Sequence, residues 1–131
     1  MSHLHELVKS ADWKSEKHVP VIDAPDTAKA DEWTVISATV GKEIAHPNTT
    51  EHHICWIALH YAPEGSPVSY ELGRFEFSAH GQSAKGANQG PAFTDSTVTI
   101  RAKLLSSGRL FATAYCNIHG LWESGKSITI A

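Results

Sequence analysis

The sequence predicts an all-β protein, an immunoglobulin-like sandwich built from seven antiparallel strands. Three observations lead to this prediction: seven short segments have strand character, clusters of turn-forming residues separate them, and no long stretch carries apolar residues at helical spacing. Seven short strands with frequent turns are typical of two antiparallel sheets packed face to face. Because no linker, repeat or low-complexity tract divides the chain, we expect one domain over residues 1–131.

The first half of the chain contains three of the expected strands. Before them, Leu4, Leu7 and Val8 form a weak apolar set that predicts only a short irregular or helical segment. Strands are expected at 18–22 (HVPVI), 32–40 (EWTVISATV) and 53–61 (HICWIALHY). The third segment is apolar on both faces, which is typical of a central strand.

The second half supplies four more strands, with segments that contain Gly, Ser, Pro or Asn between them. In TVTIRAKL, apolar and polar residues alternate, which is the pattern of a half-buried strand. The segment 79–93 between two of the strands is the longest loop, and we expect it to be mobile because it is rich in Gly, Ser, Ala and Asn. The four strands are expected at 68–77, 97–104, 109–116 and 127–130.

Length and composition narrow the function classes. A chain of 131 residues buries roughly two-thirds of its unfolded surface, so a metal ion would serve function and not folding. The net charge of -3, without a stripe of Lys or Arg, disfavours a nucleic-acid partner. Neither a signal peptide nor an apolar run of membrane-spanning length is present, so we expect a cytoplasmic protein without a membrane partner. With only Cys55 and Cys116, a disulfide framework is excluded and thiolate chemistry is expected.

Nine histidines make metal binding the leading hypothesis for a site. Cys116 ends a predicted strand and His119 lies in the following turn, although a lone Cys-x-x-His pair is equally compatible with a structural role. His46 and His52 start and end the loop HPNTTEH, where both rings can turn inward. His53 follows directly, and adjacent strand residues face opposite ways, so at most one of this histidine pair is expected to bind.

The third candidate segment is SEKHVP, at the start of the first predicted strand. In an extended chain, Glu16 and His18 point to the same side, while Lys17 reaches the metal only if the chain bends there. His18 completes five candidate ligands from three separated segments, the others being His46, His52, Cys116 and His119.

The identity of the metal depends on what the sequence lacks. A blue-copper centre also uses a C-terminal Cys-x-x-His on a β-sandwich, with two histidines, one cysteine and usually an axial methionine, but the only methionine here is Met1. Zinc prefers four ligands, one fewer than the chain offers. Four imidazoles and one thiolate favour a redox iron with an open position, one per chain. A cupredoxin-like electron carrier without substrate chemistry remains the alternative.

Four motifs in order, EKHVP, GKEIAHPNTTEHHI, GRFEFSAHG and YCNIHGLWES, resemble the superoxide reductases of the one-iron, neelaredoxin type. The resemblance spans roughly residues 12 to 124. It implies an oxidoreductase that reduces superoxide to hydrogen peroxide at a ferrous iron, with rubredoxin or a similar small protein as electron donor. It also implies a homotetramer. The implied ligands are four equatorial histidines and an axial cysteine, namely His18, His46, His52, His119 and Cys116.

The resemblance assigns two further residues. Glu16 is implied as the sixth ligand in the ferric state, and Lys17 as the cation beside the open position. The two-iron relatives, the desulfoferrodoxins, carry an N-terminal desulforedoxin-like domain with four cysteines, whereas no cysteine precedes Cys55 here. We therefore expect no such domain and no second iron.

Overall fold

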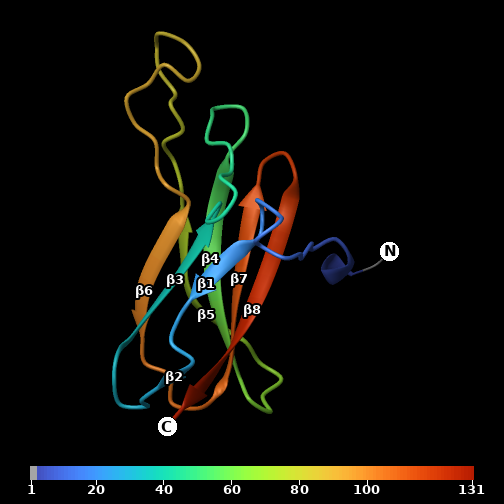
Figure 1. The fold of residues 1–131 in the computed structure, drawn as a ribbon, viewed down its shortest axis with the longest axis vertical. Helices are drawn as coiled ribbons and strands as arrows, with labels where there is room; N and C mark the ends of the chain where they lie inside the picture. Colours follow the sequence, from blue (N-terminus) through green and yellow to red (C-terminus); the bar gives the residue numbers. More distant parts are fainter. Residues whose placement is uncertain (1–2) are drawn as a thin grey trace.

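The computed structural model describes residues 3–131 and consists almost entirely of β-strands (Figure 1). The only helix in this range is a 3₁₀ turn, η1, at Leu4–Glu6, as the weak apolar set predicted. The strands are β1 Pro20–Asp23, β2 Thr27–Ala28, β3 Thr34–Val40, β4 Ile54–Pro63, β5 Tyr70–Glu76, β6 Thr97–Ala102, β7 Gly108–Cys116 and β8 Gly120–Ile130.

The strands form two sheets, which confirms the predicted all-β class. One sheet has the order β1-β3-β6 and the other β2-β8-β7-β4-β5. Every pairing between these strands is antiparallel except that of β2 with β8. Figure 1 shows the three-stranded sheet lying across the longer strands of the other sheet.

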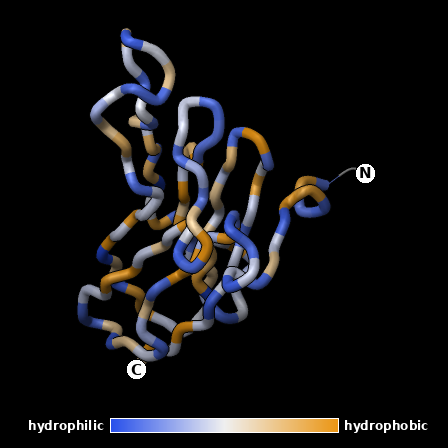
Figure 2. Tube along the Cα trace, turned by 45° about the horizontal axis from the view of Figure 1, so that its top comes forward, coloured by the Kyte–Doolittle hydropathy of each residue, from blue (hydrophilic) through white to orange (hydrophobic). Residues whose placement is uncertain are grey.

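The core lies between the two sheets, because alternate residues of their strands face inward. In β3 the buried residues include Ile36 and Ala38, and in β7 they include Leu110, Ala112 and Ala114. All five belong to one hydrophobic cluster together with Ile57 and Leu59 of β4 and Ile128 of β8. Figure 2 shows the corresponding alternation of hydrophobic and hydrophilic residues along the strands.

Two elements differ from the sequence prediction. A two-residue strand, β2, lies in the segment read as a turn and pairs in parallel with Thr129 and Ile130, so the count is eight instead of seven. The final strand begins at Gly120 instead of residue 127, because β8 pairs with β7 from Gly120 to Ile128. Among the described residues, no helix is long and apolar enough to cross a membrane.

The loops that carry the histidines meet at one end of the sandwich. Figure 1 shows the β3–β4 loop, the β7–β8 turn and the segment before β1 at the upper end of the strands, beneath the longer β5–β6 loop. The antiparallel pairing of β4 with β7 sets Ile54 opposite Cys116, so the end of the histidine loop lies beside the cysteine. The N-terminal turn projects to one side, and Leu4 and Leu7 are exposed.

Candidate metal centre

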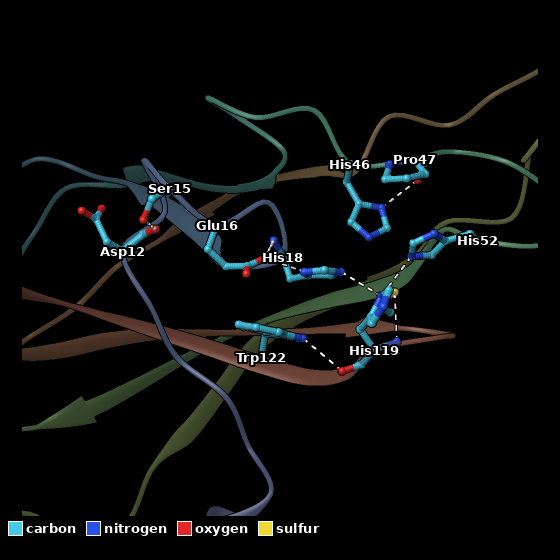
Figure 3. Close-up of polar contacts among 10 residues, drawn as sticks. Asp12, Ser15, Glu16, His18, His46, Pro47, His52, His119 and Trp122 are labelled. Atoms are coloured by element: carbon cyan, nitrogen blue, oxygen red, sulfur yellow. Dashed lines mark hydrogen bonds and ion pairs between the residues drawn. The ribbon is translucent and has the colours of Figure 1, made fainter.

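Four imidazole rings form a closed ring of neighbours around one point (Figure 3). The ring centroids lie 4.9 Å apart for His18 and His46, 4.8 Å for His46 and His52, and 5.0 Å for His52 and His119. The distance from His119 back to His18 is 4.6 Å. The diagonal from His18 to His52 is longer, at 6.4 Å. Four near-equal sides with a longer diagonal are the arrangement of four imidazoles about a shared centre.

The donor atoms of three of these rings converge with a thiol. His119 Nδ1 lies 3.1 Å from His18 Nε2 and 3.2 Å from His52 Nε2. Cys116 Sγ is 3.8 Å from the same His119 nitrogen, and the four donor atoms all lie within 4.8 Å of one another. A neutral imidazole nitrogen carries either one proton or one lone pair, so His119 Nδ1 cannot satisfy both neighbours by hydrogen bonding. A cation at their common centre would satisfy all of them.

His46 supplies the fourth ring and the most informative nitrogen. Its Nδ1 lies 2.7 Å from the carbonyl oxygen of Pro47, which can only accept, so Nδ1 carries the proton and Nε2 presents a lone pair. That Nε2 is the only buried side-chain nitrogen or oxygen without a hydrogen-bond partner in residues 3–131. Burial lowers the pKa of His46 to about 4, against the opposing effect of the Pro47 hydrogen bond. The ring is therefore kept neutral, as a metal ligand must be.

The loop that carries His46 begins with a conformation that suits glycine. Gly41 has φ +89°, and a Cβ built on it would lie 2.8 Å from the backbone nitrogen of His46. A side chain at position 41 would therefore clash with the backbone of His46.

A bend in the chain at 17–19 brings the N-terminal candidates together. Glu16 Oε1 accepts hydrogen bonds from the His18 backbone N–H at 2.9 Å and from His18 Nδ1 at 2.5 Å. Burial opposes ionisation of Glu16, but these hydrogen bonds outweigh it and lower its pKa. Because Nδ1 donates to the carboxylate, His18 Nε2 faces the cluster as a lone pair. The burial of His18 also lowers its own pKa.

Lys17 lies at the bend itself. From the sequence, we expect Lys17 to reach the metal only if the chain bends there. Its positive charge contributes to lowering the pKa of His18, His46 and His52, so its field reaches the cluster. No carboxylate within residues 3–131 forms an ion pair with it.

A tight turn explains why the structure brings His52, and not His53, to the cluster. The His52 N–H donates to Thr49 Oγ1 at 3.0 Å, and the Thr49 N–H donates to the His52 carbonyl oxygen at 3.0 Å. His53 points away, with its Nδ1 2.8 Å from the Thr49 carbonyl oxygen, and stacks on His80 at 3.6 Å between centroids.

The β7–β8 turn places the cysteine and His119. The His119 N–H donates to Cys116 Sγ at 3.4 Å, and Gly120 closes the turn with φ +84°. Cys116 is buried at the end of β7, whereas His119 is exposed, so the cluster lies at the surface. Small molecules can therefore reach it from solvent.

Trp122 contacts two of the candidate ligands, and this role could not be recognised from the sequence. Its ring stacks on His18 at 4.9 Å with an interplanar angle of 14°, and its Nε1–H donates to the His119 carbonyl oxygen at 3.2 Å. A tryptophan on a strand is usually core, and only its neighbours in space reveal this contact.

Other histidines and the second cysteine lie outside the cluster. His80 is buried, with its ring nitrogens 2.7 Å from Asn48 Oδ1 and from the Phe77 carbonyl oxygen, while His60 Nε2 lies 2.9 Å from Thr113 Oγ1. Cys55 is half-buried in a β-bulge, and burial raises the pKa of its thiol.

The donor set fits an iron ion. Metal-binding histidines usually donate their other ring N–H to a carboxylate or a carbonyl, as His18 does to Glu16 and His46 does to Pro47. Four neutral imidazoles with a single thiolate exceed the needs of a tetrahedral zinc site. The partnerless Nε2 of His46 completes the set.

Comparison with known proteins gives a consistent result. The desulfoferrodoxin family model matches residues 10–125. The chain is 53% identical to neelaredoxin from Megalodesulfovibrio gigas over 95% of this chain and 96% of the relative. It is 47% identical to superoxide reductase from Pyrococcus furiosus over 92% and 95% of the two chains. A solved structure of superoxide reductase (neelaredoxin) from Archaeoglobus fulgidus in the reduced form matches with a TM-score of 0.87 at 48% identity, over 94% of this chain and 98% of that one.

Proposed function

The chain belongs to the desulfoferrodoxin family, and from this premise we propose that it is a superoxide reductase that converts superoxide to hydrogen peroxide. The observation that carries the proposal is the convergence of four imidazoles and one thiol at the protein surface, with a buried imidazole nitrogen that has no partner. Each turnover consumes one superoxide, one electron and two protons and yields one hydrogen peroxide. The bound iron would supply the electron by cycling between its ferrous and ferric states.

We propose five residues as the iron ligands. Support comes from the ring-nitrogen distances, the lone-pair assignments and the turn that brings the sulfur to His119. The thiolate of Cys116 would donate electron density to the metal, and the hydrogen bond from the His119 N–H would moderate that donation. The ligands are His18, His46, His52, Cys116 and His119, with one iron in the single domain that we propose for the chain.

Lys17 and Glu16 would control what approaches the iron. The chain has a net charge of -3, so an anionic radical is repelled at long range and needs a local positive field. Lys17 has no ion-pair partner in the described part of the chain, so its charge is available to superoxide. Glu16 is bound to His18 in this structure, and its role as a sixth ligand in the ferric state requires it to release that ring nitrogen.

Family membership supports three further proposals, on the electron donor, the assembly and the compartment. We propose rubredoxin or a similar small electron donor, which would approach the exposed His119 edge. We also propose a homotetramer, on the family resemblance alone. We propose a cytoplasmic location because a reducing compartment keeps the Cys116 thiol available to the metal.

The decisive experiment mixes reduced, iron-loaded protein with superoxide and follows both the loss of superoxide and the evolution of oxygen. A reductase oxidises one iron per superoxide and evolves no oxygen. A dismutase would evolve oxygen, and an electron carrier would leave the rate of superoxide loss unchanged, so either outcome contradicts the proposal.

A further inference from the structure

The β5–β6 loop contributes no candidate ligand, yet it lies against the loop that supplies two of them. Several contacts join the loops: His80 lies against Asn48 and His53, Asn48 Nδ2 donates to the Thr94 carbonyl oxygen at 3.0 Å, and Asn88 reaches the tip of the turn that ends at His52. We propose that Asn88 is a positioning residue, which holds the Thr49–His52 turn and thereby fixes the His52 ring at the metal. The inference rests on the proposed function for the identity of the metal.

Asn88 uses both ends of its side-chain amide on this turn. Its Oδ1 accepts from the Thr50 N–H at 2.8 Å, and its Nδ2 donates to the two carboxylate oxygens of Glu51 at 3.1 Å each. It is also the only residue other than glycine with a positive φ, 64°, in residues 3–131. Asparagine tolerates this conformation better than most residues, so it suits this position in the loop.

Hydrogen bonds within the β5–β6 loop connect its two arms. One hydrogen bond closes the loop near its base, from Thr94 N to the Ala79 carbonyl at 2.8 Å, and two more join the arms, from Gly90 N to the Gly81 carbonyl at 2.8 Å and from Gly81 N to the Ala92 carbonyl at 3.0 Å. A Cβ on Gly81 would lie 3.2 Å from the Asn88 Cα, so the arms pack closely behind this residue. The segment expected to be mobile is thus tied at its base and at its tip.

The Thr49–His52 turn links Asn88 to the metal site because hydrogen bonds join the two ends of the turn. Thr49 hydrogen-bonds to both the N–H and the carbonyl of His52, so Thr50 and Glu51 cannot shift without moving His52. From the opposite side, Asn117 Nδ2 donates to the Glu51 carbonyl oxygen at 2.9 Å. The tip is therefore held between Asn88 and the turn that carries Cys116 and His119.

The test replaces one end of the amide. Asn88→Asp keeps the oxygen that accepts from Thr50 but places a carboxylate against Glu51, whereas Gln89→Glu makes the same amide-to-acid change at the exposed neighbour, for which no side-chain hydrogen bond is present in the described structure. We expect Asn88→Asp to lose ferrous iron to a chelator about five to ten times faster than the parent protein, near the lower end for groups that orient ligands. Gln89→Glu should match the parent, and the spectrum of the oxidised protein should shift only in Asn88→Asp.

A rescue separates positioning from general damage. In the double variant Asn88→Asp, Glu51→Gln, the new amide donates to the new carboxylate, so iron retention should return to the parent rate. If Asn88→Asp releases iron at the parent rate, or if the double variant fails to rescue it, the inference is wrong. Should Asn88→Asp not fold, Asn88→Gly deletes the amide while allowing φ 64°, and parental iron release by that variant would equally overturn it. A parent protein that takes up no iron would contradict both this inference and the proposed function.

Discussion

Replacing His46 by leucine should affect the metal-free and iron-loaded proteins in opposite directions. In the metal-free protein, His46 Nε2 is a buried lone pair without a partner, which costs about 1–3 kcal/mol of folding free energy. His46→Leu removes that cost but also removes the hydrogen bond to the Pro47 carbonyl, worth about 0.5–1.5 kcal/mol. The variant should therefore be more stable than the parent by about 1 kcal/mol at pH 7 when both lack metal.

The same substitution should remove a large pH dependence. The pKa of His46 falls from 6.5 in the unfolded chain to about 4 in the folded metal-free protein, so the unfolded chain binds a proton that the folded chain rejects. The stability that this difference provides is fully present above pH 6.5 and is lost as the pH falls through about 4. The shift corresponds to about 3 kcal/mol. Below pH 4 the advantage of His46→Leu over the parent should therefore have grown by roughly that amount.

Urea unfolding of both metal-free proteins, followed by tryptophan fluorescence between pH 3.5 and 8, measures this difference. His5→Leu, which removes an exposed histidine, controls for the general effect of a leucine and should be nearly neutral. With iron bound, the order should reverse, because a ligand that binds only the folded state adds stability that the variant loses. A metal-free variant less stable than the parent at every pH would refute the assignment of His46 Nε2 as a partnerless ligand atom.

Substitutions at three other positions test the surroundings of the metal. Lys17→Ala should slow superoxide capture by roughly tenfold or more and flatten its dependence on ionic strength, as stopped-flow mixing at several salt concentrations would show; an unchanged rate excludes the steering role. Glu16→Gln keeps an acceptor for His18 Nδ1 and should retain iron while changing the ferric spectrum, whereas Glu16→Ala should weaken iron retention by roughly 10- to 100-fold. Equal iron loss from both variants would show that the carboxylate charge, and not the acceptor, matters. Trp122→Phe keeps a ring against His18 but removes the donor to the His119 carbonyl. Urea unfolding of the metal-free protein should show that the free energy of unfolding falls by about 1 kcal/mol. An unchanged free energy would show that this hydrogen bond contributes nothing.

Strands with strict alternation could be predicted from sequence, and strands held only by backbone pairing could not. The segment 109–116 matches β7 within one residue, because every second side chain enters the core. In β8, only Trp122 and Ile128 are buried, so the first half of this strand has no apolar period to detect. The short β2 depends on pairing with Thr129 and Ile130 at the far end of the chain.

Some residues of the candidate site could likewise be predicted from the sequence, and others could not. Histidines at both ends of a Pro-Asn loop indicate inward-facing rings, and the structure does bring His46 and His52 together. The contacts of Asn88 and Trp122 could not be inferred, because an asparagine in a loop and a tryptophan on a strand are ordinary residues until their neighbours in space are known. The hydrogen bond from His18 to Glu16 likewise depends on a bend that the extended reading of this segment does not include.

The long sequence separation between His18 and His119, 101 residues, determines when the protein can acquire its metal. During synthesis the first histidine leaves the ribosome long before the last, and the two meet only after β7 and β8 have paired. A partly made chain therefore offers isolated imidazoles with weak hold on any ion, and the complete set of donors forms as the final hairpin closes. We expect iron to bind after translation, to a sandwich that has already folded. When iron is scarce, folded metal-free protein should therefore accumulate.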